Sequence, residues 1–384
     1  MKLAKLETLQ VKLPPRRVHK WTGLTEAIGG YILVKVFADT GQVGWGEAPV
    51  LKDWGGDYGR YYGETPGTTI HVIQGYLGPA VTGADPANLA ELHRIMDGAI
   101  RGYPYAKAAV EMAVYDLAAR TLGVPVFQLL GGRLRERIPI SHSIGLMKVE
   151  EAIPEVVQVV GEGIRTIKLK VGVDPARDLE MVRRVREAVG PDVGLCVDAN
   201  QGYASPAEAI RILRAMERFQ LLYAEQPVEG VARMAEVAAA LEIPVMADES
   251  AWTPQDVLEI VDRRAADLIS IYTTKPGGLY RALQVAAVAE AAGLPCNVNG
   301  SAETGVGNLA NVQLAAVARA VTLSCVIPVS TPAEHQRGQM AGIFYRDDLL
   351  LEPMRLEDGC IVVPQGPGMG IPVDEAKVAK YRVA

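Results

Sequence analysis

The chain has 384 residues, of which 49% are hydrophobic and 22% charged, and its formal net charge is −6 at pH 7. This composition is typical of a globular protein, and no run of about 18 apolar residues predicts a membrane span. The slight acidity and the lack of a basic patch argue against a nucleic-acid partner. No basic segment followed by an apolar run begins the sequence, so we expect a cytoplasmic protein. The four cysteines are widely spaced, which favours reduced core residues over disulfides.

Residues 1 to about 130 predict an α+β domain. Two stretches alternate apolar and polar residues as antiparallel strands do, and Asp39-Thr40-Gly41 marks a turn within the second. Three helical patterns follow, and Gly123 with Pro125 just beyond it predicts the end of the last one. The expected strands are residues 5–14 and 31–48, and the expected helices are residues 68–78, 89–96 and 106–122.

From about residue 138, short apolar runs alternate with amphipathic helical stretches. Eight such runs predict the eight parallel strands of a β/α barrel. These expected strands are residues 139–145, 166–172, 194–200, 222–227, 244–249, 267–274, 295–300 and 323–328. The tail lacks this repeat, so we expect it to pack back on the first domain. The predicted division is a capping domain of residues 1–130, completed by residues 345–384, and a barrel domain of residues 131–344.

Lysines and acidic residues stand at the ends of successive barrel strands. Lys168 and Lys170 close the second run, and Lys275 follows the sixth. The three runs between them end in carboxylates, at Asp198, Glu225 and Asp248. Every strand of a β/α barrel delivers its C-terminal end to the same face, so these groups should meet there. Three carboxylates suit a hard divalent cation, Mg²⁺ or in its place Mn²⁺. The alternative for any single acid is a solvated loop charge or a helix cap.

The lysines indicate proton transfer beside such a cation, because a bound cation acidifies the proton α to a substrate carboxylate. Lys168 and Lys170 alternate with Leu169, so both point into the barrel, and their mutual repulsion favours a neutral amine. Lys170 is nearer the strand end and is the expected base. For Lys168 we expect tuning of Lys170 and contact with the substrate carboxylate, or a salt bridge to a neighbouring acid. Lys275, four strands further round, lies opposite Lys170 and can serve the other face of a planar intermediate.

The strand-end motifs resemble those of the muconate-lactonizing-enzyme subgroup of the enolase superfamily, over nearly the whole chain. They are TIKLKVG, VDAN, AEQP, MADES and the lysine before PGG. The resemblance implies a (β/α)7β modified barrel with an N-terminal α+β cap, Mg²⁺ bound by the three strand-end carboxylates, and Lys170 and Lys275 as acid/base catalysts. It implies that Asn200 and Glu249 support the metal ligands from behind, although adjacent Asp248 and Glu249 leave open which one binds the metal. It also implies a homo-oligomer, a dimer or an octamer.

Motifs of several related subgroups are absent from this sequence. The mandelate-racemase-like subgroup is expected to carry a histidine after the seventh strand, but none of the five histidines lies near residues 296–307. Dipeptide epimerases are expected to hold an Asp-x-Asp pair after the eighth strand, whereas this chain reads VIPVSTPAEH there. Muconate cycloisomerases are expected to have an acid close to the end of that strand, and the first acid here is Glu334. These absences disfavour acid-sugar dehydration, dipeptides and muconate itself.

Specificity is expected to come from the cap loops, because the barrel positions are committed to the metal and to proton transfer. Residues 14–30 and 49–67 form two long loops rich in glycine and aromatic residues. Their side chains could form a lid over a flat apolar ring or, by cation–π contact, over a quaternary or cyclic ammonium. The lid residues are His19, Trp21, Trp54, Tyr58, Tyr61 and Tyr62. The alternative is that most of them pack the cap against the barrel. Hydrogen bonds to substrate are expected from the end of the seventh strand, at Asn297, Asn299, Ser301 and Glu303.

The sequence therefore predicts a metal-dependent enzyme that removes the proton α to a carboxylate, with cycloisomerisation or racemisation/epimerisation as the outcome. β-Elimination from a hydroxy acid or a cyclic hydroxy amino acid is the second chemistry, because the same enolate can expel a leaving group. A non-catalytic barrel that binds a metal or a ligand is the alternative of another class. The two strand-end lysines argue against it, since binding alone needs no base on each face.

Overall fold

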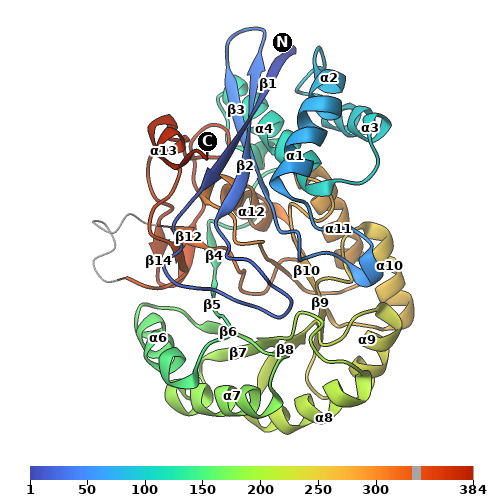
Figure 1. Cartoon of the computed structure of the whole chain (residues 1–384), viewed down its shortest axis with the longest axis vertical. Coiled ribbons are helices and arrows are strands. Elements are labelled where there is room, and N and C mark those ends of the chain that lie inside the picture. Colours follow the sequence, from blue (N-terminus) through green and yellow to red (C-terminus); the bar gives the residue numbers. More distant parts are fainter. Residues whose placement is uncertain (331–338, 384) are drawn as a thin grey trace.

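The computed structural model describes residues 1–330 and 339–383, and these form a cap above a β/α barrel (Figure 1). The cap sheet is an antiparallel meander in the order β1-β2-β3. Its strands are β1 (Leu3–Lys12), β2 (Gly30–Ala38) and β3 (Val43–Pro49). The turn expected at residues 39–41 lies between β2 and β3. The second expected strand is therefore a hairpin, as its turn signal predicts.

The helices of the cap pack on one face of this sheet, where the long helix α4 contacts β2 and β3. A Cβ atom on Gly44 or Gly46 would come within 2.1 Å of Ala113 O or 2.0 Å of Ala109 O, so only glycine permits this approach. Helix α4 ends at Leu122 and is followed by the expected Gly123, which has the left-handed conformation with φ of 70°. The cap helices are α1 (Pro66–Val72), the π-helical turn η2 (Ile73–Leu77), α2 (Gly78–Val81), α3 (Leu89–Ala99), α4 (Pro104–Leu122) and α5 (Val126–Leu129).

Seven parallel strands form the barrel sheet, in chain order from β5 to β11. They are β5 (Ser141–Ile144), β6 (Thr166–Lys170), β7 (Gly194–Asp198), β8 (Leu221–Glu225), β9 (Val245–Ala247), β10 (Leu268–Ile271) and β11 (Cys296–Val298). The segment expected as the eighth strand is not a continuous strand. It makes isolated parallel bridges from Cys325 to Ile140 and from Val321 to Cys296, which connect the two edges of the sheet. The ladder is irregular because Thr322 N and Leu323 N both donate to Cys296 O.

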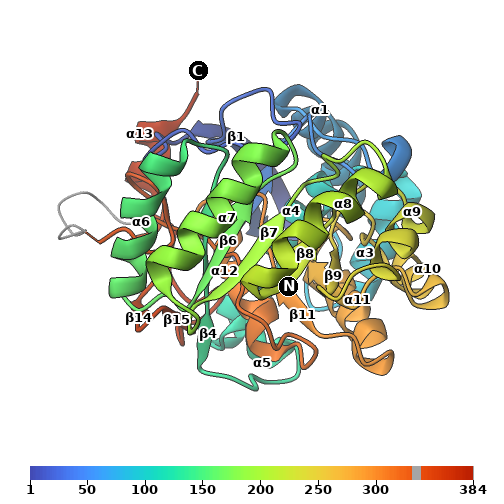
Figure 2. The same ribbon diagram turned by 90° about the horizontal axis from the view of Figure 1, so that it is seen from below.

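Amphipathic helices cover the outside of the barrel, and Figure 2 shows α6 to α10 side by side along it. The barrel helices are α6 (Val149–Gly161), α7 (Pro175–Val189), α8 (Pro206–Met216), α9 (Val231–Ala238), α10 (Pro254–Arg263), α11 (Leu279–Ala291) and α12 (Gly305–Val317). A separate cluster of Cys196, Tyr223, Met246 and Leu268 lies on neighbouring barrel strands. Since Cys196 is in register with Lys168 on β6, this apolar layer lies just below the charged strand ends.

The tail contacts both domains. Its strand β15 (Cys360–Val362) pairs with β14 (Leu356–Glu357) and with β4 (Arg137–Pro139) at the start of the barrel domain. Its helix α13 (Glu375–Tyr381) packs against β1, and Val383 N donates to Gln10 O at 2.8 Å. A further pair, β12 (Val329–Ser330) with β13 (Ile343–Tyr345), brings the start of the tail to the barrel mouth.

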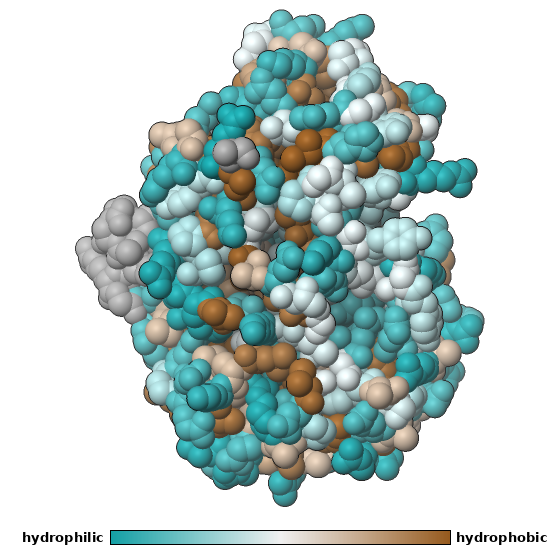
Figure 3. Space-filling model, in the orientation of Figure 1, coloured by the Kyte–Doolittle hydropathy of each residue, from teal (hydrophilic) through white to brown (hydrophobic). Residues whose placement is uncertain are grey.

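The surface seen in Figure 3 is mostly hydrophilic, and its hydrophobic residues are scattered between polar ones. Within residues 1–330 and 339–383, no helix has the length and apolar character required to cross a bilayer.

Candidate active site

Lysines and carboxylates from adjacent strand ends form ion pairs at the barrel mouth. Lys170, Asp198 and Glu225 are in register across β6, β7 and β8. Lys168 Nζ lies 2.9 Å from Asp198 Oδ2 and 2.7 Å from Glu225 Oε1, and Lys170 Nζ lies 2.6 Å from Asp198 Oδ2. These side chains are almost wholly buried, so the attraction between them is little screened by water.

A second ion pair lies on the far side of this carboxylate row. Lys275 Nζ donates to Asp248 Oδ1 at 2.8 Å, to Asp248 O at 2.9 Å and to Ser270 O at 2.7 Å. Tyr272 donates its hydroxyl to Asp248 Oδ2 at 3.0 Å. The sequence reasoning missed Tyr272. A signal was available, since Tyr272 lies near the end of the sixth expected strand, three residues before Lys275.

Asn200 and Glu249 connect the metal-ligand candidates to the cap. Asn200 Oδ1 accepts from Lys170 Nζ at 2.7 Å, and Asn200 Nδ2 donates to Glu249 Oε1 at 2.9 Å. Trp54 Nε1 from the cap donates to the same oxygen at 3.1 Å. The structure thus places both residues beside Asp198 and Asp248, and it adds Trp54 as their contact with the lid.

Burial and ion pairing shift the acidities of these groups in opposite directions. Burial favours a neutral Asp198, but Lys168 and Lys170 outweigh it and lower the Asp198 pKa to about 2. Burial and then the charge of Asp198 raise the pKa of Glu225 well above its usual value. Burial with Asp248 nearby raises the Glu249 pKa to about 8. For Lys168, burial is outweighed by Asp198, Glu225 and Asp248, which raise its pKa. Mutual repulsion of the lysines was expected to favour a neutral amine. For Lys168 the neighbouring carboxylates outweigh this repulsion, so its protonated form is favoured.

The carboxylate oxygens of this site are the type of ligand that a hard divalent cation binds. In the part of the chain that the structure describes, no group of three or more His, Cys, Asp or Glu residues is arranged to hold a metal ion, because lysine ammonium groups lie between the acids. Four buried carboxylates nevertheless face three lysines, and Glu225 Oε2 and Glu249 Oε2 are buried without a hydrogen-bond partner. An oxygen-binding cation would supply the missing positive charge.

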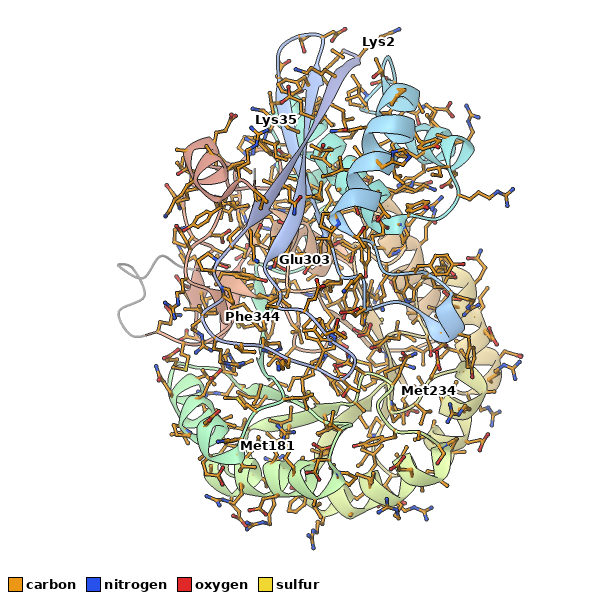
Figure 4. The ribbon with its side chains drawn as sticks, viewed as in Figure 1. Lys2, Lys35, Met181, Met234, Glu303 and Phe344 are labelled. Carbon is orange, nitrogen blue, oxygen red and sulfur yellow. The ribbon has the colours of Figure 1, made fainter. Side chains whose placement is uncertain are left out.

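A pocket lies above the ion pairs, with an empty volume of about 490 Å³, its opening to solvent included. It contains many of the expected site residues, namely His19, Trp21, Trp54, Lys168, Lys170, Asn200, Asn299 and Ser301. Trp21 lies over Lys170, with Nζ 5.6 Å from the ring centroid, and Asn299 Nδ2 donates to Glu225 Oε1 at 3.1 Å. The sequence reasoning missed Leu51, Ser143 and Phe344, which also line the pocket. Figure 4 places Phe344 between cap and barrel.

Other expected substrate-binding residues lie outside this pocket. Tyr58 is 68% exposed, and its backbone N–H donates to Glu229. Tyr61 stacks on Trp252 at 4.9 Å, and its hydroxyl donates to Asp256 Oδ1 at 3.3 Å. Tyr62 is 79% exposed. Asn297 and Glu303 are fully buried and do not line the pocket. Glu334 falls outside the residues that the structure describes.

Comparison with known proteins identifies the family. The N-terminal domain of the mandelate racemase / muconate lactonizing enzyme family matches residues 6–131, and the enolase C-terminal domain-like family matches residues 151–377. The chain belongs to the mandelate racemase/muconate lactonizing enzyme family. Muconate cycloisomerase 1 of Rhodococcus opacus is 31% identical to this family member, covering 97% of this chain and 96% of the relative. L-Ala-D/L-Glu epimerase of Bacillus subtilis is 35% identical, covering 84% and 87%. N-succinyl-L-Arg/Lys racemase of Bacillus cereus is 32% identical, covering 84% and 86%.

Solved structures of the family have the same fold. The 2-chloromuconate cycloisomerase of Rhodococcus opacus 1CP superposes with a TM-score of 0.90 at 30% identity, over 100% of both chains. The N-succinyl Arg/Lys racemase of Bacillus cereus gives 0.89 at 28% identity, over 100% of this chain and 99% of that one. The predicted barrel with an N-terminal cap and the predicted resemblance to the enolase superfamily are confirmed. The relatives are racemases, epimerases and cycloisomerases, so this family member is an enzyme of the isomerase class.

Proposed function

We propose that this enzyme removes the proton α to a substrate carboxylate and returns a proton to either face, so that the overall reaction is racemisation or epimerisation. The observation that carries the proposal is the placement of Lys170 and Lys275. They stand at the ends of β6 and β10, and the carboxylates of β7, β8 and the β9 end lie between them in the sheet order. A planar intermediate above the carboxylates would present one face to each lysine.

We propose Asp198, Glu225 and Asp248 as the residues that hold Mg²⁺, or Mn²⁺ in its place. When bound, the cation would supply positive charge that stabilises the enolate formed from the substrate carboxylate. Support comes from the oxygen donor set, from the buried Glu225 Oε2 that has no hydrogen-bond partner and from the general use of Mg²⁺ in the superfamily. Glu249, held by Asn200 and Trp54, is assigned to support Asp248 rather than to bind the metal.

The surrounding hydrogen bonds support a proposed role for each lysine. Lys170 is oriented by Asp198 and Asn200 and lines the pocket. Lys275 is held by Asp248 and the Ser270 carbonyl and is not among the residues that line this pocket, so it is separated from Lys170 by the carboxylate row. One amine takes the α-proton and the opposite ammonium delivers a proton to the other face. Lys168, whose pKa is raised by three carboxylates, stays protonated and pairs with the substrate carboxylate.

Cycloisomerisation is the second candidate outcome, because the muconate cycloisomerase of Rhodococcus opacus matches 97% of the chain. It needs proton transfer at one face, so one lysine would act as the acid/base group and the other would stabilise charge. β-Elimination from a hydroxy acid uses the same first step and differs in losing a leaving group.

Deuterium exchange tests the proposal. The purified enzyme is loaded with Mg²⁺, incubated in D₂O with a panel of N-acyl amino acids, proline betaines, hydroxy acids and muconates, and followed by NMR. Racemisation gives α-deuterium and loss of optical rotation. Elimination gives a new double bond, and cycloisomerisation gives a lactone. Removal of the metal by EDTA should stop exchange, and Mg²⁺ should restore it. If none of the carboxylates in the panel exchanged its α-proton, the proposal would be refuted.

A further inference from the structure

His19 is held from behind by an arginine. The ring is buried, with 5% of its surface exposed, yet it lines the pocket and packs edge-on against Phe344 at 4.6 Å. Arg17 Nη1 lies 3.2 Å from His19 Nδ1. A guanidinium can only donate hydrogen bonds, so Nδ1 must be the acceptor, and the ring proton of a neutral His19 is on Nε2.

Arg17 is itself fixed by a buried carboxylate. Arg17 Nε donates to Glu155 Oε2 at 3.0 Å, and Nη2 donates to Glu155 Oε1 at 2.9 Å. Arg16 and His142 contact the same carboxylate, each at 2.8 Å from Oε1. The bidentate pair fixes the plane of the guanidinium and therefore the direction of its bond to His19. Glu155 lies on α6, so a barrel helix sets the orientation of a cap-loop side chain.

The surroundings keep His19 neutral. Burial is the main cause that lowers its pKa well below the usual value, and the charges of Arg17, Lys170 and His142 add to it, while Glu155 opposes them. Within residues 1–330 and 339–383, no protein atom makes a hydrogen bond to His19 Nε2. The pocket-lining ring therefore has a free N–H on the nitrogen that Arg17 does not contact.

We propose that Glu155 and Arg17 fix the Nε2-protonated tautomer of His19, and that His19 donates from Nε2 to an uncharged oxygen of the substrate. This inference rests on the proposed function, in which the reacting carboxylate is bound by Lys168 and the cation. The oxygen at His19 is a second one, an amide carbonyl or a hydroxyl. His19 thus selects substrates that carry such an acceptor, and Glu155 and Arg17 are positioning residues that act through it.

NMR reads the tautomer without any substrate. Long-range proton–nitrogen spectra of the protein labelled with ¹⁵N-histidine show which ring nitrogen of each of the five histidines is protonated. The His19 signals are assigned by their loss in His19→Phe, and His71→Phe is the matched control at an exposed histidine. We expect a neutral ring protonated at Nε2 at pH 7, and a mixture of tautomers in Arg17→Met. A ring protonated at Nδ1, or a charged ring, would overturn the inference.

Kinetics then test the hydrogen bond to substrate. Each accepted acid is compared with an analogue that has CH₂ or hydrogen in place of the acceptor oxygen, and separate pairs distinguish carbonyl from hydroxyl. His19→Phe should lower kcat/KM about threefold to tenfold for the parent acid, mainly through KM, and should not affect the analogue. His19→Gln should restore most of the loss, because its amide N–H can replace Nε2–H. If His19→Phe lowered kcat/KM equally for the parent acid and for the analogue, while α-proton exchange still occurred, the inference would be overturned and the proposed function would not. Absence of exchange with an intact Nε2–H tautomer would refute the proposed function and the substrate contact together.

Discussion

Glu47 offers a sharp test of how the cap is joined to the barrel. It is fully buried on β3, and it accepts from Thr304 N at 2.9 Å, from Gly307 N at 3.1 Å and from the Thr304 hydroxyl. These groups begin α12, directly after the pocket residues 299–302. Burial raises the Glu47 pKa to about 8, even though the hydrogen bonds from Thr304 and Gly307 oppose it. The cap therefore holds one wall of the pocket through a carboxyl group that keeps its proton at neutral pH.

This raised pKa makes the contribution of Glu47 to stability depend on pH. An acid that is harder to ionise in the folded state stabilises the fold most below its unfolded pKa of about 4.5, and the stabilisation is lost as pH rises towards 8. One pKa unit corresponds to about 1.4 kcal/mol, so the loss between pH 5 and pH 7 is about 3 kcal/mol. Glu47→Gln removes this dependence. It also weakens the contacts with α12, at a cost of about 1–3 kcal/mol that does not vary with pH.

Urea unfolding of both proteins at pH 5, 6, 7 and 8 measures the difference. We expect the unsubstituted protein to have the larger free energy of unfolding at pH 5. The difference from Glu47→Gln should shrink by about 3 kcal/mol by pH 7. Substitution of the exposed Glu352 by glutamine provides the control, for which the difference should not change in this way. If the free energies of unfolding of the unsubstituted protein and of Glu47→Gln changed with pH in parallel, the reasoning would be refuted. The folded and unfolded states would then bind the same number of protons at Glu47.

The remaining predictions concern the proposed catalytic and metal-binding groups and one glycine. Lys170→Ala and Lys275→Ala should each lower racemisation by about 100-fold or more, while each variant still exchanges the α-proton of one enantiomer in D₂O. Full activity of both variants would exclude these lysines as catalysts. Asp248→Asn should weaken Mg²⁺ binding in calorimetry more than Glu249→Gln does, and the reverse order would exchange their roles. Gly278→Ala should destabilise the fold by about 2 kcal/mol or more in thermal unfolding, because φ is 133° and a Cβ would lie 2.4 Å from Glu111 Cδ. An unchanged melting temperature would show that the loop adapts.

The sequence predicted the barrel and the arrangement of the strand-end groups because both follow from a repeating pattern. Each strand-and-helix unit returns the chain to the same face, so Lys170 and Asp198 could be placed beside each other without coordinates. A salt bridge from Lys168 to a neighbouring acid was one of the expected alternatives, but the sequence did not tell which acids each lysine would contact. The choice depends on which charged side chains come within about 3 Å of each other in the folded interior, and the spacing of residues in the sequence does not give these distances.

Pocket residues from non-repeating segments could not be predicted in the same way. Phe344 reaches the pocket because its carbonyl accepts from Arg16 N at 2.7 Å, a contact between segments more than 300 residues apart in sequence. Tyr58 and Tyr61 stand in an aromatic loop with Trp54, and composition alone does not tell which rings turn inward. The Trp54 ring turns inward, because its N–H donates to Glu249, whereas the Tyr61 hydroxyl donates to Asp256, which does not line the pocket.

Buried carboxylates connect the chemistry of the barrel to the specificity of the cap. Glu155 orients Arg17 beside the first lid loop, and Glu249 binds Trp54 of the second. Asp57 of the second loop accepts from Gln201 and from Gly230 N on the barrel, each at 2.9 Å. A carboxylate can accept several hydrogen bonds at once, so each of them joins segments that are distant in sequence. Glu155 and Asp57 make no contact with the strand-end lysines or with Asp198, Glu225 and Asp248, so changes in these two carboxylates should alter which acids bind before they alter how the α-proton moves. Glu249 differs from them, because Asn200 connects it to Lys170, and a change there should affect both.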